Sequence, residues 1–508
     1  MAFEPMYDEL KNDYRKKLVS AQTAVETRLT AEAGADFAGV LCVGADAVIT
    51  GFEALSGEAR YGGRVNYKLL YLDSSAKCRC LEYSEDFNGT LASPDITPAA
   101  ELQLRAAVID ADTVSVNAAE IKLAAVAEIT LFKLACDEIR YLKGDPELYT
   151  RKSEISCSEL AARLQDEFVS SEEFDIKDEI TQVLMCETSA YLGACRPEAD
   201  CLALSGKIIT ALTYLTADDD IKSRIIVGDF SQELPCSGAR AGDTAECAAS
   251  VSKSAAKLQL SDAGNSVIRD CAISVDAAVY RNAVCEAVVD AFSVSHELQV
   301  VSESFLVNRL ECSLVCPDKI EGSAALADNI PSIDTVLAVC GNRINIANAY
   351  TAEGRTVLEG LVNCNIIYYN AEKQNKFSVS AELPYSITLN SDSAREGMTV
   401  LAGAVITDIH ARQRRAGEVD ISVNVMFSAD LYGSVINYVI KEVEQGAQRD
   451  TSLSAFAIHI TREGELLWDV AKSLCTTPEL IMMQNPGLKL PLIGGERILV
   501  YRQQKARF

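Results

Sequence analysis

Cysteine and histidine side chains are the first candidates for chemistry in this chain, because thiolates and imidazoles bind metal ions and serve as nucleophiles and bases. Two cysteine pairs, Cys78-Arg-Cys80 and Cys312-x3-Cys316, have spacings that resemble half of a metal site, and neither has a second half nearby in the sequence. The histidines are widely separated: His296, His410 and His459. We therefore expect both cysteine pairs to be packing residues, and the sequence predicts no metal site.

Two charged clusters are the next candidates. Asp218-Asp219-Asp220 follows a strand-like run directly and is most simply a charged hairpin tip, with a divalent-cation site as the alternative. Arg412-Gln-Arg-Arg415 lies between two strand-like runs and is either a solvated turn, which we favour, or a basic loop that docks an acidic partner. The motifs of phosphate-binding loops, hydrolase nucleophile elbows and zinc proteases do not occur. We expect a non-enzymatic protein with no catalytic residue and no cofactor.

The part of the chain that carries most of these residues consists of one sequence unit that is repeated three times. Each copy has a glycine eight residues before a tyrosine: Gly63 and Tyr71, Gly206 and Tyr214, Gly360 and Tyr368. Downstream, Glu233-Leu-Pro-Cys236 in the second copy matches Glu382-Leu-Pro-Tyr385 in the third, and Glu85-Asp-Phe87 is a degraded match in the first. The glycines lie 143 residues apart (63 to 206) and 154 residues apart (206 to 360), which favours tandem domains over a short solenoid repeat.

Apolar and polar residues alternate with period two in a later strand of each copy. The alternation is clearest from Ile421 to Phe427, and its counterparts run from Ile273 to Val279 and begin at Ile121 to Leu123. Turn-like stretches separate further short runs, which predicts a β-sandwich-like domain in each copy. Two stretches, Asp8 to Leu18 and Ser158 to Phe168, instead have a helical pattern. We expect a mainly β chain with minor helix.

The C-terminal segment has a different pattern. Ile458-His-Ile460 alternates like a half-buried strand, and the apolar residues from Leu467 to Leu474 share one face of a helix. Thr477-Pro478 is a cap and first-turn proline for a second helix, which Asn485-Pro-Gly487 ends. Ile498 to Tyr501 is a second short strand. The sequence therefore predicts a strand–helix–helix–strand module.

The formal net charge of −26 is unevenly distributed. From Ile458 to Phe508 there are seven basic and five acidic residues, a net of +2, so the rest of the chain carries −28. An acidic body repels phosphate backbones, so we expect no nucleic-acid partner. The basic tail is most simply solvated, with an acidic protein surface or lipid headgroups as alternatives: Arg502, Lys505 and Arg507. No apolar run approaches the ~18 residues that span a bilayer.

The cysteine content bears on the compartment. Seventeen cysteines would permit disulfides, but the number is odd, the start of the chain has no secretory signal, and most cysteines lie in apolar strand-like runs. Free cysteine behaves as a small buried hydrophobe. We therefore expect reduced thiols and a cytoplasmic protein.

The terminal module resembles a LysM domain, on the order of its landmarks from Ile458 through Trp468 and Asn485-Pro-Gly487 to Tyr501. LysM domains that bind N-acetylglucosamine chains usually carry Gly-Asp-Thr before the first helix, where this chain has Gly464-Glu465-Leu466. The lost threonine hydroxyl removes a helix cap and a polar group facing the groove. The resemblance therefore implies the fold more strongly than it implies sugar binding.

The triplicated unit resembles the SPOCS domain of sporulating Firmicutes, on its Gly-x7-Tyr strand, the Glu382-Leu-Pro-Tyr385 segment and the Val288-Val-Asp-Ala-Phe-Ser293 ending. A SPOCS domain followed by a C-terminal LysM module is the arrangement of spore coat morphogenetic proteins of the SipL type in clostridia. The resemblance implies three SPOCS-like β domains and a LysM domain, with these limits: 1–145, 146–293, 294–448 and 455–503.

This resemblance implies a scaffold or adaptor for spore coat assembly, placed in the mother cell at the forespore surface. Its LysM domain would dock the coat basement-layer morphogenetic ATPase through the groove residues: Gly464, Glu465, Leu466, Trp468, Asn485, Pro486, Gly487 and Leu488. Trp468, the only tryptophan, is either a core anchor or an interface contact. The alternatives are a peptidoglycan-binding wall protein, whose LysM domain binds N-acetylglucosamine chains, and a phage-type or housekeeping assembly protein.

Overall fold

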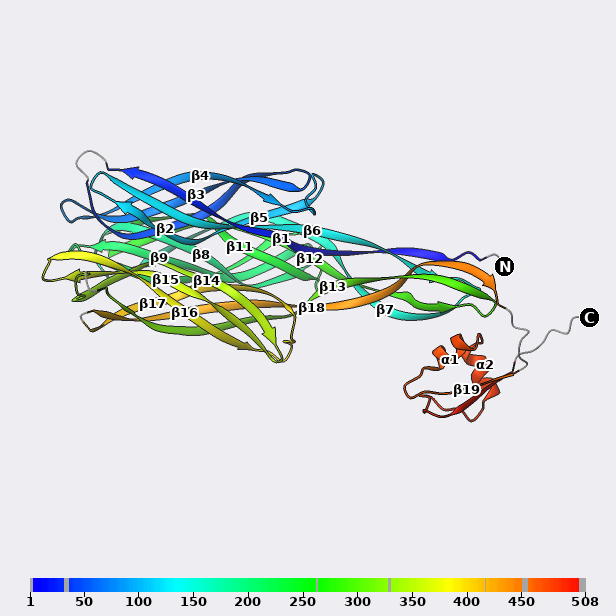
Figure 1. The fold of residues 1–508 in the computed structure, drawn as a ribbon. Helices are drawn as coiled ribbons and strands as arrows, with labels where there is room; N and C mark the ends of the chain where they lie inside the picture. The colour runs from blue at the N-terminus through cyan, green and yellow to red at the C-terminus, as the bar shows by residue number, and fades with distance from the viewer. Residues whose placement is uncertain are drawn as a thin grey trace, which may run out of the picture.

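The computed structural model describes residues 3–31, 36–261, 264–327, 330–415, 417–449 and 456–501. The prediction of a mainly β chain is confirmed, because long antiparallel strands make up most of these residues (Figure 1). The first part of the chain, copy 1, forms two three-stranded sheets with strand orders β1-β6-β5 and β2-β3-β4. Its strands are β1 (Met6–Thr30), β2 (Phe37–Ala54), β3 (Glu58–Asp73), β4 (Cys78–Ala92), β5 (Glu101–Val116) and β6 (Glu120–Gly144).

The next two parts of the chain repeat this topology strand for strand. Copy 2 has the sheets β7-β12-β11 and β8-β9-β10, and copy 3 has the sheets β13-β18-β17 and β14-β15-β16. The strands of copy 2 are β7 (Tyr149–Asp175), β8 (Ile180–Glu198), β9 (Cys201–Thr216), β10 (Ile221–Pro235), β11 (Thr244–Ser261) and β12 (Gly264–Phe292). Those of copy 3 are β13 (His296–Ala325), β14 (Thr335–Ala352), β15 (Arg355–Asn370), β16 (Asn375–Asn390), β17 (Thr399–Arg415) and β18 (Glu418–Gln448).

The alternating runs lie in the central strands β6, β12 and β18, as expected from their pattern. The apolar residues of each run are buried, whereas the residues between them are more exposed, except Ala278, which is also buried. Each copy builds a core of its own around its central strand, and partly buried residues of the other strands pack against that core.

The Gly-x7-Tyr pattern has a packing explanation. Each glycine lies in the middle strand of its sheet, directly opposite an aromatic residue of the next strand: Gly63 and Phe87, Gly206 and Phe230, Gly360 and Tyr385. A Cβ atom at any of these glycines would collide with that ring, so only glycine leaves room for it. The tyrosine that follows each glycine is buried.

The predicted match between the two Glu-Leu-Pro segments is wrong. The register places Phe230, not Cys236, opposite Gly206, so Phe230 is the counterpart of Tyr385. Leu234 pairs with Leu202, before the glycine of its copy, whereas Leu383 pairs with Val362, after the glycine of its copy. The shared letters are therefore a coincidence at different positions of the repeat.

The two predicted helical stretches are also strands. Asp8 to Leu18 lies in β1 and Ser158 to Phe168 lies in β7, where they pair with β6 and β12. Both strands have register shifts in these regions, between Lys17 and Val19 and opposite Val279 and Tyr280. A bulge shifts the alternation of faces by one residue, so the local period no longer looks like two. The long pairing of β1 with β6 and of β7 with β12 then decides the structure.

The three copies pack against one another side by side. Three apolar clusters each combine residues of all three copies; one contains Cys42, Met185 and Ala338, and another contains Tyr141, Cys157 and Phe305. The long antiparallel strand pairs β1–β6, β7–β12 and β13–β18 run together into the narrow end of an elongated body, whose wide end holds the other sheets (Figure 1). The copies therefore form one bundle with approximate threefold symmetry.

The terminal module has its elements in the predicted order: β19 (Phe456–Ile460), α1 (Leu467–Ser473), α2 (Pro478–Gln484) and β20 (Arg497–Tyr501). Its core contains Val470, Ala471, Ile481, Ile498 and Val500, with Leu467 and Leu474 packed against it. Thr477 caps α2 by accepting a hydrogen bond from the Leu480 amide at 3.1 Å. No helix among the described residues is long and apolar enough to span a membrane.

Candidate functional site

The outer face of the β19–β20 hairpin is apolar and exposed. Ile458 and Ile460 were predicted to be half-buried, but their side chains are 57% and 61% exposed. The predicted alternation is correct, but the two isoleucine side chains face away from the core of the module. Ile498 and Val500 of β20 fill that core instead. Phe456 and Tyr501 face each other across the strands on the same outer side, and both are more than half exposed.

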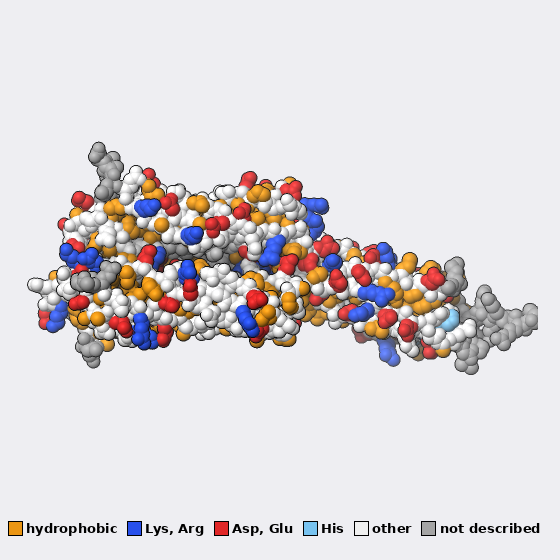
Figure 2. All heavy atoms as spheres, turned by 90° about the horizontal axis from the view of Figure 1, so that it is seen from above, with side chains coloured by type: hydrophobic (Ala, Val, Ile, Leu, Met, Phe, Trp, Pro, Cys, Tyr) orange, Lys and Arg blue, Asp and Glu red, His pale blue; other side chains and the backbone are white. Residues whose placement is uncertain are grey.

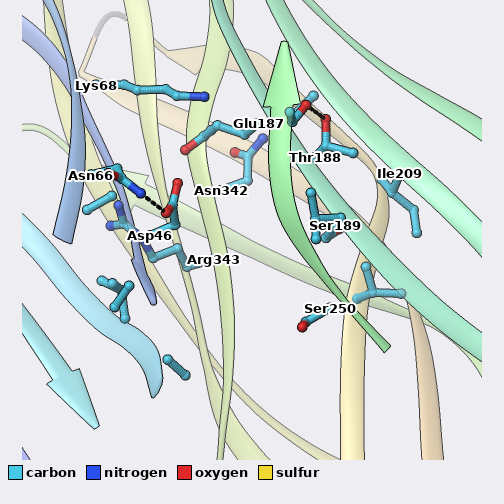
Figure 3. Close-up of a pocket in the computed structure, with 18 of the residues that line it drawn as sticks. Asp46, Asn66, Lys68, Glu187, Thr188, Ser189, Ile209, Ser250, Asn342 and Arg343 are labelled. Atoms are coloured by element: carbon cyan, nitrogen blue, oxygen red, sulfur yellow. Dashed lines mark hydrogen bonds between the residues drawn. The ribbon is translucent and has the colours of Figure 1, made fainter. Parts of the chain in front are cut away.

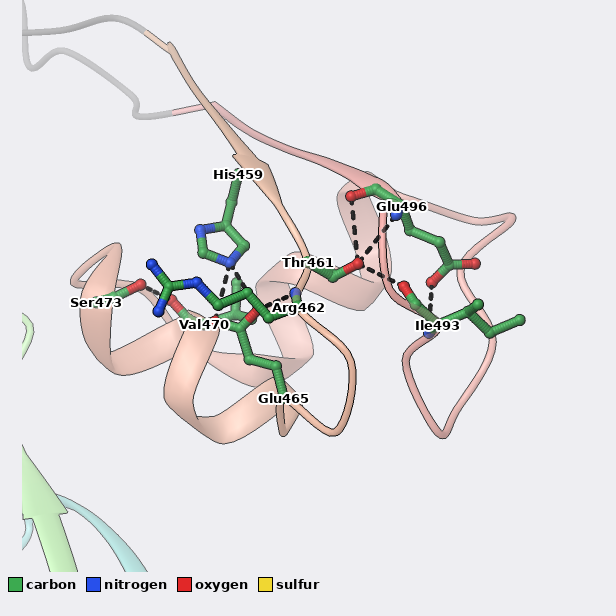
Figure 4. A network of polar contacts seen from close by, with 8 residues as sticks. All are labelled: His459, Thr461, Arg462, Glu465, Val470, Ser473, Ile493 and Glu496. Carbon is green, nitrogen blue, oxygen red and sulfur yellow. Dashed lines mark hydrogen bonds and ion pairs between the residues drawn. The ribbon is translucent and has the colours of Figure 1, made fainter.

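The loop before α1 is closed by a polar network within the module (Figure 4). His459 Nε2 lies 3.0 Å from both carboxylate oxygens of Glu465, and the Arg462 amide donates to the same carboxylate at 2.8 Å. The hydrogen bond from His459 and the backbone bond from Arg462 lower the pKa of Glu465 below its ordinary 4.5. Glu465 therefore holds β19 to the loop and is engaged within the module.

The other predicted groove residues divide into engaged and exposed positions. The Asn485 side chain donates to the carbonyls of Ile481 and Leu499 and accepts from the Leu499 amide, at 2.7 to 2.9 Å, so it ties α2 to β20. Leu488 packs on the module core. The remaining members are exposed: Gly464, Leu466, Pro486 and Gly487. Leu466 is the N-cap of α1 and makes no side-chain cap, as expected from the missing threonine.

Trp468 contacts the body of the same chain. Its indole Nε1 donates to Asp290 Oδ2 of β12 at 2.7 Å, and its ring meets Phe292 edge-on with ring centroids 4.9 Å apart. Lys472 Nζ donates to the other Asp290 oxygen at 2.6 Å. Burial raises the pKa of Asp290, but the hydrogen bonds from Lys472 and Trp468 outweigh it, so the pKa lies below its ordinary 3.8. Helix α1 is thus docked on the end of β12.

Asp218 to Asp220 form a hairpin tip, whereas Arg412 to Arg415, predicted to lie between two strands, are the last residues of β17. Asp219 accepts a hydrogen bond from Lys376 Nζ on its backbone oxygen at 2.7 Å, so this tip joins copy 2 to copy 3. Arg412 and Arg414 pair with acidic residues across their own hairpin, Asp420 among them. Within the described ranges, no three His, Cys, Asp or Glu residues are placed to hold a metal ion.

The first cysteine pair lies in β4, where burial raises the pKa of Cys78 and of Cys80 to about 12. At neutral pH both therefore stay protonated thiols, and a thiol is a poor metal ligand. The second pair, Cys312 and Cys316, lies along β13 next to the core of copy 3. The packing role predicted for these residues agrees with their positions.

A cavity of about 790 Å³ lies between the three copies in the wide part of the body (Figure 3). The charged side chains that line it come from all three copies: Asp46, Lys68, Glu82, Glu187, Lys253 and Arg343. Lys68 Nζ donates to the Cys186 carbonyl at 2.5 Å, and Arg343 Nη2 donates to the Val43 carbonyl at 3.1 Å. Burial raises the pKa of Glu187, which Arg343 and Lys68 oppose. The Lys68 and Arg343 contacts therefore join the copies. No sequence motif indicated these residues, because they are distant in the chain and come together only in the folded bundle.

On the face of the body shown in Figure 2, acidic and basic side chains are interspersed, and apolar side chains lie between them along the narrow end. The basic tail predicted as a contact, Arg502 to Arg507, lies outside the described residues. The excess negative charge of the body is therefore spread over its surface on this face.

Comparison with known families gave one match, to the family described as SipL, SPOCS domain, over residues 332–413. This segment covers β14, β15, β16 and most of β17, so it lies within copy 3. The predicted SPOCS resemblance is thus supported for that part of the chain. No curated protein and no solved structure matched the chain.

Proposed function

We propose that this chain is a non-enzymatic scaffold of spore coat assembly, built from three SPOCS-type β domains with the limits predicted above and a C-terminal LysM domain. The observation that carries the proposal is the SPOCS match at residues 332–413, on a six-strand topology that occurs three times. By the same resemblance, we place the protein in the mother cell at the forespore surface, with the coat basement-layer ATPase as its partner.

The proposed contact surface is the outer face of the terminal hairpin. Phe456, Ile458, Ile460 and Tyr501 present four neighbouring apolar side chains, and contiguous exposed apolar side chains are typical of protein interaction sites. Helix α1 faces the body, so the hairpin face stays free while the module is docked. Glu465 is occupied by His459 and Arg462, which favours a protein partner over N-acetylglucosamine chains at this module.

The test is a binding measurement between the full-length chain and the purified coat basement-layer ATPase of the same host. Ile458→Ser combined with Ile460→Ser should weaken binding at least tenfold, because two apolar contacts are lost while serine leaves the strand intact. Val169→Ser is the matched control, since Val169 is an equally apolar and 74% exposed residue of β7, far from the module in sequence.

Co-sedimentation with peptidoglycan separates the proposal from the glycan alternative. The full-length chain should remain in the supernatant. Robust pelleting together with no binding to the ATPase would overturn the proposal in favour of a wall protein. Equal weakening by the Val169→Ser control would overturn the assignment of the contact surface.

A further inference from the structure

A second cavity, of about 290 Å³, lies where the long paired strands of the three copies converge, and we call it the waist cavity. All three copies contribute aromatic rings to its wall: Tyr14 of β1 and Phe132 of β6, Tyr280 of β12, and Tyr432 of β18. Phe132, Tyr280 and Tyr432 occupy equivalent positions, because each directly follows the last fully buried residue of its alternating run: Leu131, Val279 and Leu431. The repeat thus brings three aromatic side chains to one cavity.

Buried polar atoms without hydrogen-bond partners line the same cavity. Arg15 Nε and Glu246 Oε2 are 3.8 Å apart, beyond hydrogen-bond distance, and neither atom has another partner in the described part of the chain. The Tyr280 hydroxyl is likewise buried and unpartnered among these residues. The Arg15 side chain is only 9% exposed. Each unmade buried hydrogen bond costs about 1–3 kcal/mol, so the cluster calls for an occupant.

Arg15 and Glu246 are the largely buried charges of the waist cavity, and each is opposed by a charge of the other sign. Arg15 Nη2 forms an ion pair with Asp276 Oδ1 at 3.0 Å. Burial raises the pKa of the Glu246 carboxyl, and the nearby Arg15 charge opposes this. The other charged residues that line the cavity are half-buried or exposed: Asp13, Lys17 and Arg309. A charged occupant between Arg15 and Glu246 would add an uncompensated charge to a buried site, which is costly. The cavity therefore favours an uncharged molecule.

The waist cavity also departs from the symmetry of the bundle. Glu246 pairs with Ala278, two residues before the ring of its copy; the equivalent positions, opposite Thr130 and Asp430, hold Arg105 and Leu401. By contrast, the buried tyrosine that follows each repeat glycine is present in all three copies. Of the three residues at the differing position, Glu246 and Leu401 line the cavity and Arg105 does not, so the polar lining of the site is asymmetric.

We propose that the waist cavity binds a small, uncharged aromatic carboxamide. The carbonyl of such a group would accept from Arg15 Nε and the Tyr280 hydroxyl, and its N–H would donate to Glu246 Oε2. The flat ring would lie among Phe132, Tyr432 and Leu401. This inference concerns the body of the chain and does not depend on the proposed partner of the terminal module.

Benzamide is the probe, titrated into the full-length chain by calorimetry. It should bind saturably, and methyl benzoate, which lacks the N–H donor, should bind at least tenfold more weakly. Tyr280→Phe and Glu246→Gln should each weaken benzamide binding about five- to tenfold. The matched control is Tyr191→Phe, which removes another buried and unpartnered hydroxyl that does not line the waist cavity, and it should leave the affinity unchanged.

Leu401→Trp tests the site without touching its polar atoms. Leu401 is 46% exposed, so a larger side chain there is compatible with folding, and it should occupy the cavity and abolish binding. The proposal is overturned if benzamide shows no saturable binding, or if Tyr191→Phe weakens binding as much as Tyr280→Phe. A crystal structure soaked in benzamide, with ordered waters alone on Arg15 Nε, Glu246 Oε2 and the Tyr280 hydroxyl, would overturn it equally.

Discussion

The docking of the terminal module on the body can be tested directly, because Trp468 is the only tryptophan of the chain and reports its own surroundings. Asp290 accepts from both Trp468 Nε1 and Lys472 Nζ, so Asp290→Ala removes both polar contacts at once. The edge-on contact of Trp468 with Phe292 would remain. We expect this single substitution to shift the module toward the undocked state.

The magnitude follows from the two contacts. A hydrogen bond to a charged group contributes about 1.5–3 kcal/mol, and the indole of Trp468 is half-buried, so this range applies. The Lys472 side chain is 45% exposed, so its ion pair adds only about 0–1 kcal/mol. A loss of about 1.5–4 kcal/mol in total lowers the docking equilibrium constant roughly 10- to 1,000-fold.

The assay is the emission maximum of Trp468 together with its quenching by acrylamide. In Asp290→Ala the emission should move to longer wavelength and quenching should rise, because the indole gains water contact. The control is Glu286→Ala, which removes another β12 carboxylate that is 69% exposed and pairs with Lys152. Unchanged emission and quenching in Asp290→Ala, or the same change in the control, would refute the docking.

Gly360→Ala should lower the free energy of unfolding by about 1–3 kcal/mol, and with it the urea midpoint, because the new Cβ would collide with the Asn345 backbone oxygen. The control is Gly39→Ala, which should leave the midpoint unchanged because a Cβ there has no atom within 4 Å. The pKa of Asp290 is lowered from 3.8, so its stabilisation of the docked state is complete above that value and is lost as the pH falls below it. Trp468 emission should therefore be constant from about pH 8 to about pH 5, and a shift near neutral pH would contradict this assignment. Thr477→Ala should cost α2 about 1 kcal/mol and speed hydrogen exchange there; unchanged exchange would argue against the cap.

The sequence predicted the features that depend on local patterns. The alternating strands and the helix faces and capped α2 of the module follow from periodicity and from residues such as Thr477. The repeat glycines were recognised from spacing alone, although their reason, an aromatic ring on the neighbouring strand, needs the register. Such features can be predicted from the sequence because the interactions that determine them span a few residues or one hairpin.

Features that depend on tertiary packing were not accessible from the sequence. The inverted face of Ile458 and Ile460 is one case, because alternation gives the period but not the side that faces the core. The Trp468 contact with Asp290 is another, since the two residues lie 178 positions apart. The predicted groove of the module likewise turned out to hold residues that stabilise it, Glu465 and Asn485 among them.

The docking of the module at the end of β12 has a structural reason in the repeat. The three central strands end together at the narrow end of the body, and their last residues are Gly144, Phe292 and Gln448. Only the end of β12 therefore offers an aromatic ring, and Asp290 beside it offers an acceptor. A nearly symmetric bundle thus receives one module in one place. Because α1 makes this contact, the apolar hairpin face stays exposed, as the partner contact that we propose for it requires.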